Sequence, residues 1–434
     1  MSYDEIGCGR KREVEYLEEI NVAALSNKKK IINDPVFGFI SVPNEFLFDL
    51  LQHTYVQRLN RIRQLGLSYY VYPGATHTRF LHSLGAMHLM QEAIGVLRQK
   101  NILISHEEAN AAMAAILLHD IGHGPFSHVL EHTLVSGISH EDISLLMMQH
   151  INAEMNGALD DAIRIFKNEY PKHFLHQLVS SQLDVDRLDY LCRDSFFCGV
   201  NEGTVASARI LKMLNVRDDK LVVDAKGIYS IEKFLVARRL MYWQVYLHKT
   251  SVAAEQLLIR ILQRAKHLAM HGADLFASPA LRFFLYHEIT REHFLASEKA
   301  LNNYALLDDS DILSAIKVWA ETDDKVLSLL CSSFMNRRLF KVKMTDEPLT
   351  ETERRELSLQ YQDAFSLTEE EAAYFFSEHS SVTNTYSPKD DNIGILFGDG
   401  KIKDIAEASD MLNLQVLTKR VEKHYLFYYL LANN

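Results

Sequence analysis

The sequence predicts a mainly α-helical fold with small β-hairpins and a small α+β lobe at the C-terminal end. Apolar residues recur at helical spacing over most of the 434 residues. Glycine and proline interrupt these stretches at the points where helices are expected to end. Short runs rich in Val, Ile and Phe, which favour strands, break the helical pattern in three places.

In chain order, a polar and charged lead-in over residues 1–30 is expected to hold a short helix. The segment KKIINDPVFGFISVP alternates apolar residues around two prolines and a glycine, and predicts a short strand or hairpin. Helical periodicity starts at Glu45, and the loop YYVYPGATHT separates the first helices from the next group. Further helices are predicted over residues 79–100, 107–121, 126–134 and 140–156, and helical segments continue to Arg193.

The second half begins with DDKLVVDAKGIYSI, where Asp224–Gly227 lies between two β-rich runs and predicts a hairpin turn. One or two long helices are predicted over Ile231–His267, and more helices over residues 280–380. In IGILFGDGKIKDI, the run Gly398-Asp399-Gly400 predicts another hairpin turn. A final helix is predicted from about Leu412 to Leu431.

The charge, the hydropathy pattern and the cysteine content of the sequence argue against several classes of protein. The net charge of −11 gives no general attraction to nucleic acid, so no nucleic-acid partner is expected. No apolar run reaches the length that a membrane span needs, and the N-terminal sequence lacks the apolar region of a signal peptide. The four cysteines show no paired spacing, which favours reduced thiols and a cytoplasmic location.

The segment AAILLHDIGHGPFSH holds the densest group of candidate functional residues. An apolar run leads into His119 and Asp120, and glycine and proline then end the helix before His123 and His128. Imidazole and carboxylate groups together suit Mn, Fe, Zn or Ni better than Ca. Taken alone, the His-Asp pair also fits satisfied core histidines beside a helix-terminal charge.

Two further blocks extend this pattern: QLGLSYYVYPGATHTRFLHSLG upstream and DVDRLDYLCRD downstream. With LLHDIGHGPFSH, they resemble the HD-domain deoxynucleoside triphosphate triphosphohydrolases, a family that includes bacterial dNTPases and the mammalian SAM-and-HD-domain enzyme. The resemblance runs from about Asn33 to about Lys341. We therefore expect a lead-in with a short strand or hairpin at residues 1–44, an HD-type catalytic helical core at 45–265, a helical extension at 266–380 and the α+β lobe at 381–434.

The resemblance assigns the ligands of one divalent transition metal, Mn, Fe, Zn or Ni, and Mg²⁺ stays open as an additional ion. The ligands are His82, His119, Asp120 and Asp186. Two neutral imidazoles and two carboxylates leave positions for water and a phosphate oxygen, as metal-assisted hydrolysis requires. A core histidine is the alternative for His82 alone, and Asp184 and Asp189 are expected to cap the helix or form salt bridges outside the site.

A set of acid and base groups matches family positions that line the phosphate pocket. These are His123, His128, Glu131 and His140. Hydrolysis at the α-phosphorus expels the nucleoside 5′-oxygen, which a histidine can protonate near neutral pH. The family has Asp where this chain has Glu131, so the donor stays open; His128 is favoured, with His140 and Glu131 in support. His140 also fits a simple helix cap.

Asp186, Tyr190 and Asp194 recur every fourth residue and so share one face of a predicted helix over about 12 Å. The resemblance places Tyr190 and Asp194 at the substrate 3′-hydroxyl. It also places Gln64 and Leu65 against the sugar and Arg79 at the α-phosphate.

A triphosphate needs cations beyond the metal. Arg187 follows a metal ligand, where the mammalian enzyme has Lys. Four residues recur on one face of the helix after the second predicted hairpin: Arg238, Tyr242, Tyr246 and Lys249. Arg238 and Tyr246 match family phosphate contacts, whereas Tyr242 replaces a family histidine; an ordinary amphipathic face is the alternative.

The segment NRRLFKVK resembles the stretch with which mammalian-type members hold nucleotides at subunit interfaces. The matching residues are Arg337 and Lys341, and Asn33 lies in a matching NDP segment. In mammalian-type members, an Asp and an Arg recognise guanine at this interface. This chain has Gln52 and Asn60 at the matching positions, and these side chains can bind several bases. The resemblance thus implies a homodimer or homotetramer with an interface nucleotide that is not strictly guanine.

The expected activity is hydrolysis of a dNTP to a deoxynucleoside and inorganic triphosphate by a metal-activated water. One alternative is an HD phosphohydrolase that acts on another nucleotide, such as a monophosphate or a cyclic or alarmone species. A catalytically weak nucleotide-sensing scaffold is a second alternative, against which the intact H…HD…D set argues. The sequence contains no P-loop, GxSxG or HExxH motif.

Overall fold

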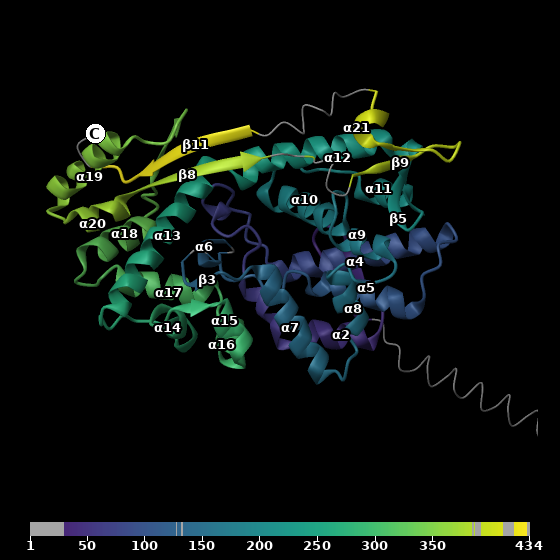
Figure 1. The fold of residues 1–434 in the computed structure, drawn as a ribbon, viewed down its shortest axis with the longest axis horizontal. Helices are drawn as coiled ribbons and strands as arrows, with labels where there is room; N and C mark the ends of the chain where they lie inside the picture. Colours follow the sequence, from purple (N-terminus) through teal and green to yellow (C-terminus); the bar gives the residue numbers. More distant parts are fainter. Residues whose placement is uncertain are drawn as a thin grey trace, which may run out of the picture.

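The computed structural model describes residues 30–431 except 127, 132, 384–385, 387–391 and 411–420. The predicted N-terminal helix and the first part of the predicted C-terminal helix lie outside these residues. The fold is mainly α, as the sequence predicts, and Figure 1 shows most helices in two groups below a long β-ribbon. No helix of the described residues is both long and apolar enough to cross a membrane.

One group of helices holds the motif residues (Figure 1). It comprises α2 (Glu45–Gln52), α3 (Thr54–Arg58), α4 (Arg79–Gln99), α5 (His106–Leu118), α6 (His128–Glu131), α7 (His140–Glu154), α8 (Asp160–Phe166), α9 (His173–Val179), α10 (Val185–Cys198), α11 (Ser207–Met213) and α12 (Ile228–Met241). The second group comprises α13 (Lys249–Met270), which packs against α18, together with α14 (Pro279–Leu285), α15 (Arg291–Ala296), α16 (Glu298–Leu306), α17 (Asp309–Trp319), α18 (Lys325–Met335), α19 (Glu351–Phe365) and α20 (Glu369–Ala372).

Within the described residues, four small sheets complete the fold. β1 (Lys30–Asp34) and β2 (Gly38–Val42) form the predicted antiparallel hairpin, and β3 (Val135–Ser136) pairs in parallel with β6 (Ile289–Thr290). The third sheet has the order β10 (Ile402–Asp404), β9 (Gly394–Leu396), β5 (Lys220–Asp224), β4 (Leu214–Arg217), with the short helix α21 (Ile405–Ala408) after β10. The fourth has the order β7 (Lys341–Thr345), β11 (Val421–Tyr428), β8 (Phe376–Thr383).

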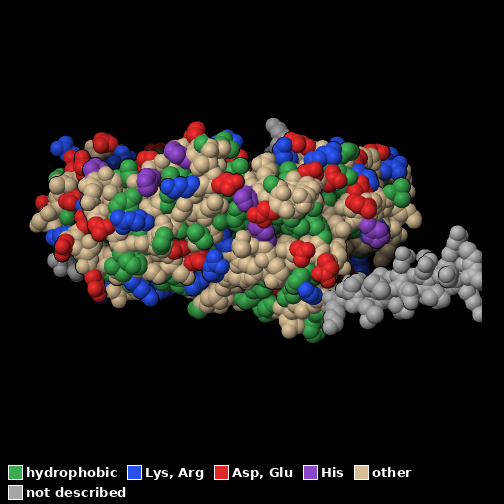
Figure 2. Space-filling model, turned by 90° about the horizontal axis from the view of Figure 1, so that it is seen from below, with side chains coloured by type: hydrophobic (Ala, Val, Ile, Leu, Met, Phe, Trp, Pro, Cys, Tyr) green, Lys and Arg blue, Asp and Glu red, His purple; other side chains and the backbone are tan. Residues whose placement is uncertain are grey.

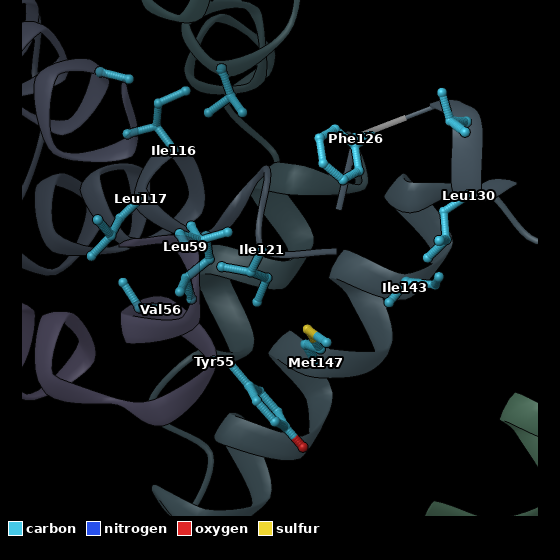
Figure 3. Packing of buried hydrophobic residues seen from close by; sticks show 14 of the residues in the cluster. Tyr55, Val56, Leu59, Ile116, Leu117, Ile121, Phe126, Leu130, Ile143 and Met147 are labelled. Atoms are coloured by element: carbon cyan, nitrogen blue, oxygen red, sulfur yellow. The ribbon is translucent and has the colours of Figure 1, made fainter. Parts of the chain in front are cut away.

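Helix α5 is the centre of the first group because it is apolar on every side from Ala111 onward. All residues from Ala111 to Leu118 are buried, and α4 and α8 pack against it. Its N-terminus is fixed by a capping box in which Ser105 and Glu108 each bond the other's backbone. Figure 3 shows side chains of α3, α5, α6 and α7 packed around Ile121, just beyond the end of α5. This packing anchors the His-Asp segment at its exit from α5.

The predicted hairpin near residue 224 exists, but its turn was placed wrongly. β4 and β5 are joined at Asp218 and Asp219, which adopt φ values of +52° and +60°. Aspartate tolerates this left-handed conformation better than most residues do. Asp224–Gly227 instead leads through a short 3₁₀ turn into α12. The hairpin predicted at Gly398-Asp399-Gly400 is confirmed as the β9–β10 connection.

The predicted C-terminal helix is wrong over its described part, because residues 421–428 form strand β11. This strand pairs with β8 from Val421↔Thr383 to Tyr428↔Phe376, and with β7 on its other side. Two partner strands and a buried Phe427 outweigh the helical spacing of the aromatics. The all-helical reading of residues 280–380 likewise overlooked β7, and the helix predicted at 126–134 is confined to α6. The expected domain boundaries after residues 265 and 380 fall within α13 and β8, which continue across them.

Candidate metal centre and substrate pocket

Three of the predicted metal ligands converge from three helices. His82 lies in the first turns of α4, His119 ends α5, and Asp186 lies in the first turn of α10. One potential ligand atom from each lies within 4.8 Å of the others. The oxygen Oδ1 of Asp186 is 3.1 Å from Nε2 of His82 and 3.3 Å from Nε2 of His119.

The two imidazoles are held with Nε2 facing the centre. Nδ1 of His119 lies 2.6 Å from the carbonyl oxygen of Ile116, and Nδ1 of His82 lies 2.7 Å from Oδ2 of Asp189. Both Nε2 atoms are buried and, within the described residues, have no hydrogen-bond partner of acceptable geometry. Buried nitrogens that converge on a carboxylate without a hydrogen bond fit metal ligation, so the residues present suit a divalent transition metal.

Asp120, the fourth predicted ligand, lies on the edge of this cluster. Its Oδ1 is 3.3 Å from Nε2 of His119, and its Oδ2 is 3.9 Å from Nε2 of His82. Oδ2 also accepts a 2.6 Å hydrogen bond from Nη1 of Arg79. Arg79, which the resemblance places at the α-phosphate, therefore reaches the candidate metal centre through Asp120.

The electrostatics of the cluster favour a bound cation. Burial alone would lower the pKa of His82, but Asp186 and Asp189 outweigh burial and raise it to about 10. Burial would raise the pKa of Asp186, but the imidazoles of His119 and His82 outweigh it and hold that pKa well below its usual range. Ionised carboxylates that face imidazoles in a buried site will bind either a proton or a metal ion.

The loop after His119 is braced from three sides. Oγ of Ser144 in α7 donates to the carbonyl oxygen of His119 and accepts from the backbone N–H of Gly122. The buried guanidinium of Arg58 donates to the carbonyl oxygen of Ile121, and the Tyr304 hydroxyl donates to that of Gly122. A Cβ at Gly122 would lie 2.1 Å from the carbonyl oxygen of His140, so only glycine fits there.

Two of the four predicted acid–base groups stack on each other. The rings of His123 and His140 lie 3.9 Å apart at an interplanar angle of 17°. Burial, with Arg79 as a second cause, lowers the pKa of His123 to about 3, so this imidazole is neutral near pH 7. His128 and Glu131 lie in α6, but their side chains are outside the described part of the structure.

A pocket of about 530 Å³ opens beside the cluster. Its lining contains seven of the predicted substrate residues: Gln64, Leu65, Arg79, Tyr190, Asp194, Tyr242 and Tyr246. Gln256 of α13 and His379 of β8 line it as well, and Ser377 of β8 donates a 2.9 Å hydrogen bond to Gln256. The C-terminal sheet therefore supplies part of the pocket wall, which the sequence did not indicate.

Asp194 lies buried in this pocket with both carboxylate oxygens engaged. Oδ1 is 2.7 Å from Nε2 of His77, and Oδ2 accepts a 2.9 Å hydrogen bond from the Tyr246 hydroxyl. The His77 ring stacks on Phe197 at 4.5 Å. His77 was not among the predicted site residues, although it lies in the segment QLGLSYYVYPGATHTRFLHSLG that carries the family resemblance.

The predicted phosphate cations lie apart from this lining. Arg187 pairs with the buried Asp184, and Nη1 of Arg238 is 3.1 Å from Oε1 of Gln182. Burial, and then the charge of Arg187, lowers the pKa of Arg238, so the two guanidiniums are close enough to repel. Nε of Arg187 is buried with no hydrogen-bond partner in the described residues. Lys249 is exposed at the start of α13.

The predicted interface residues are all exposed and lie on separate elements. Asn33 is on β1, Lys341 begins β7, and Arg337 precedes β7 with a φ of +56° and a hydrogen bond to the Tyr70 carbonyl oxygen. Among the described residues, no hydrogen bond or ion pair joins any two of them. On the face shown in Figure 2, acidic and basic side chains are interspersed and form no large patch of one sign.

Comparison with known proteins identifies the family. The profile described as HD domain matches residues 79–194, and the profile described as HD associated region matches residues 205–277. The uncharacterized protein YwfO of Bacillus subtilis is 32% identical over 419 residues, which cover 93% of this chain and 92% of that protein. This chain belongs to the HD-domain family that includes the deoxynucleoside triphosphate triphosphohydrolases.

Other members of the HD-domain family add to this assignment. The crystal structure of a phosphohydrolase from Bacteroides thetaiotaomicron has a TM-score of 0.90 and 60% identity, covering 92% of this chain and all of that one. Human SAMHD1, a deoxynucleoside triphosphate triphosphohydrolase, is 29% identical over 287 residues, which are 56% of this chain and 45% of that protein. The chain is therefore an HD-domain phosphohydrolase with a candidate divalent-metal site at His82, His119 and Asp186.

The sequence missed residues whose roles depend on the fold. Asp189 was assigned to capping or salt bridges, but it also fixes the His82 imidazole. Ser144 carried no sequence signal at all. A search for buried polar residues one helical turn from each ligand would have found Asp189, which lies one turn after Asp186.

Proposed function

We propose that this HD-domain protein hydrolyses dNTPs to a deoxynucleoside and inorganic triphosphate. The observation that carries the proposal is the position of Arg79. Its side chain lines the 530 Å³ pocket and also bonds Asp120 at the candidate metal centre. A substrate in that pocket would therefore have one end at the metal and its sugar among Tyr190, Asp194 and Tyr246.

We assign the metal to His82, His119, Asp120 and Asp186. When bound there, a divalent ion such as Mn, Fe, Zn or Ni supplies Lewis acidity and lowers the pKa of water, and Mg²⁺ remains open as an additional ion. Arg79 is proposed to hold the α-phosphate, since its guanidinium can exchange part of its bond to Asp120 for a phosphate oxygen.

Recognition of a polyphosphate is supported by Arg187 and Arg238. Two neighbouring, partly buried guanidiniums repel each other, and an anion between them would relieve that repulsion. The unpaired Nε of Arg187 offers a donor for the same purpose. A nucleoside monophosphate would leave these cations unused, so a triphosphate fits better. Lys249 and Tyr242 are proposed to add contacts at the exposed end.

Departure of the nucleoside 5′-oxygen needs a proton donor. His123 is unsuitable as the acid because its pKa of about 3 leaves it neutral near pH 7. We therefore propose His128 as the donor, with Glu131 and His140 in support. His123 is then a neutral group that holds Asp120 from one side, with Nε2 at 3.4 Å from Oδ1.

Selection of the deoxyribose is proposed to come from Gln64, Leu65, Tyr190 and Asp194. The fixed carboxylate of Asp194 can accept a hydrogen bond from a 3′-hydroxyl through its remaining lone pairs. Oε1 of Gln64 is buried without a hydrogen-bond partner in the described residues, so it too can accept from the sugar. Leu65 packs beside it and would crowd a 2′-hydroxyl.

A nucleotide site between subunits is proposed at Asn33, Arg337 and Lys341, in a homodimer or homotetramer. Support comes from the exposure of all three residues, which leaves them open to a second chain and a phosphate. Since Gln52 and Asn60 match the guanine-recognising positions, a dNTP is the expected effector. Its binding between subunits should shift the equilibrium toward the active assembly.

Product analysis tests the proposed function. The protein is incubated with Mn²⁺ and each dNTP, and the products are separated by ion chromatography. Equal amounts of deoxynucleoside and inorganic triphosphate are expected. Arg238→Ala should raise the KM about tenfold, because it removes one charge-assisted hydrogen bond to the substrate. The control is Lys233→Ala, at an exposed position on α12, which should leave the KM unchanged. Hydrolysis of another nucleotide with no dNTP turnover would favour the alternative phosphohydrolase, and metal binding without any product would favour a sensing scaffold.

A further inference from the structure

Four buried side chains connect the N-terminal hairpin to the candidate metal centre. Asp34 of β1 accepts a 2.7 Å hydrogen bond from Nη1 of Arg193. Nη2 and Nε of Arg193 each lie 2.9 Å from an oxygen of Asp189. Oδ2 of Asp189 is 2.7 Å from Nδ1 of His82. All four side chains have an exposed fraction of 0%.

A glycine in α4 provides the space for this network. A Cβ at Gly85 would lie 2.0 Å from Oδ1 of Asp189 and 2.1 Å from Nη2 of Arg193. Glycine inside a helix is less stable than alanine, so its presence needs a local reason. A Cβ at Gly95, ten residues later in the same helix, would meet nothing within 4 Å. Only the first glycine is required by close packing.

Asp34 connects the network to the geometry of the hairpin turn. Its Oδ1 accepts hydrogen bonds from the backbone N–H of Val36 at 2.9 Å and of Phe37 at 2.8 Å, while Oδ2 binds Arg193. The Phe37 ring lies 5.6 Å from the guanidinium of Arg193. Burial would lower the pKa of Arg193, but Asp189 and Asp34 outweigh burial and raise it, so this buried cation depends on both carboxylates.

We propose that Asp34 is a positioning residue for the metal centre. Through Arg193 it holds Asp189, and Asp189 holds the His82 imidazole with Nε2 directed at Asp186. The inference rests on the assignment of His82 as a metal ligand in the proposed function. A carboxylate that accepts from the distal nitrogen of a ligating histidine sets its orientation and tautomer. Freed from Asp34, the Arg193–Asp189 pair can shift, and the His82 ring shifts with it.

The variant Asp34→Asn tests this role. Asparagine keeps Oδ1 as acceptor for the turn but replaces the oxygen that binds Arg193. The probe is Mn²⁺, with the free ion measured by electron paramagnetic resonance on the full chain. The Kd for Mn²⁺ should rise about three- to tenfold, less than the 10–100-fold effect typical of a direct partner of a ligand. Asp224→Asn removes a partly exposed ion pair with Lys100 and is the matched control, with an unchanged Kd.

A second pair of variants tests the same network without removing any of its members. Gly85→Ala should displace Asp189 and raise the Kd for Mn²⁺ at least about tenfold, and Gly95→Ala should leave it unchanged. The absorption spectrum of bound Co²⁺ should change in Gly85→Ala, because the His82 ligand is reoriented. Wild-type Mn²⁺ affinity in folded Asp34→Asn and Gly85→Ala would overturn the positioning role. That outcome is distinct from failure of the proposed function, in which Mn²⁺ still binds but no dNTP is cleaved.

Discussion

The hydroxyl of Ser144 lies 2.7 Å from the carbonyl oxygen of His119, to which it donates, and it accepts a 2.9 Å hydrogen bond from the N–H of Gly122. One buried serine of α7 thus ties together the two ends of the loop that carries His119 and Asp120. The position of a candidate metal ligand therefore depends on a helix that contributes no ligand itself.

Ser144→Ala should destabilise the protein and weaken metal binding. The change leaves a buried carbonyl oxygen and a buried N–H without their partner, which costs about 1–3 kcal/mol of unfolding free energy. Urea unfolding measures this loss, and Mn²⁺ titration should show a several-fold higher Kd. Ser358→Ala, at a buried serine in the distant helix α19, is the control and should not alter Mn²⁺ affinity. Equal Mn²⁺ affinity in both variants would contradict the account.

Gly122→Ala should abolish most of the activity. The added Cβ would lie 2.1 Å from the carbonyl oxygen of His140 and 2.3 Å from the N atom of Ser144, so the loop must move. A shift of the reacting groups by about 1 Å commonly costs about 100-fold in rate. The comparison is Gly398→Ala, whose Cβ would meet nothing within 4 Å. Similar kcat values for the two variants would show that the loop tolerates displacement.

Tyr246→Phe should weaken substrate binding more than it changes kcat. It removes the hydroxyl that donates to Oδ2 of Asp194, so only His77 still holds that carboxylate. Loss of one hydrogen bond to a charged group predicts a KM for dNTP that is about tenfold higher. Tyr229→Phe, at a 57% exposed residue of α12, is the control. An unchanged KM in Tyr246→Phe would remove Asp194 from sugar recognition.

Asp309→Asn should stabilise the protein above pH 6. Burial raises the Asp309 pKa to about 6, although the backbone N–H of Arg63 donates to its Oδ2. Because the pKa of Asp309 is higher in the folded state, the protonated carboxyl makes its full contribution to the free energy of unfolding below about pH 4. That contribution is lost as the pH rises through 6. Asparagine keeps the acceptor and carries no charge. Calorimetry should show a gain of about 3 kcal/mol at pH 8 and almost none at pH 4; a loss at pH 8 would contradict the assignment.

The residues of the candidate metal centre could be named from the sequence, because the family resemblance covers His82, His119, Asp120 and Asp186. His119 and Asp120 are adjacent at the end of an apolar helix, and Asp186, Tyr190 and Asp194 share a helix face, so their grouping follows from helical geometry. Contacts between residues far apart in the sequence were not predictable. The bond from Asp189 to His82 joins positions 107 residues apart.

The missed strand β7 and the wrongly predicted helix at residues 421–428 have the same cause, because the two segments pair with each other as strands. The aromatic segment at residues 421–428 has helical spacing, but its pairing with β8 decides its conformation, and β8 lies nearly forty residues earlier in the chain. The ion pairs of two arginines could not be predicted from the sequence either. Arg79 and Arg187 looked like free phosphate ligands, whereas the fold gives each a carboxylate partner, Asp120 and Asp184.

In the proposed reaction, water attacks the α-phosphorus of a dNTP. The most direct test is turnover of one dNTP with Mn²⁺ in H₂¹⁸O, with the phosphate products analysed by mass spectrometry. One ¹⁸O atom is expected in inorganic triphosphate and none in the released deoxynucleoside. Label in free monophosphate, with a deoxynucleoside diphosphate left over, would contradict it.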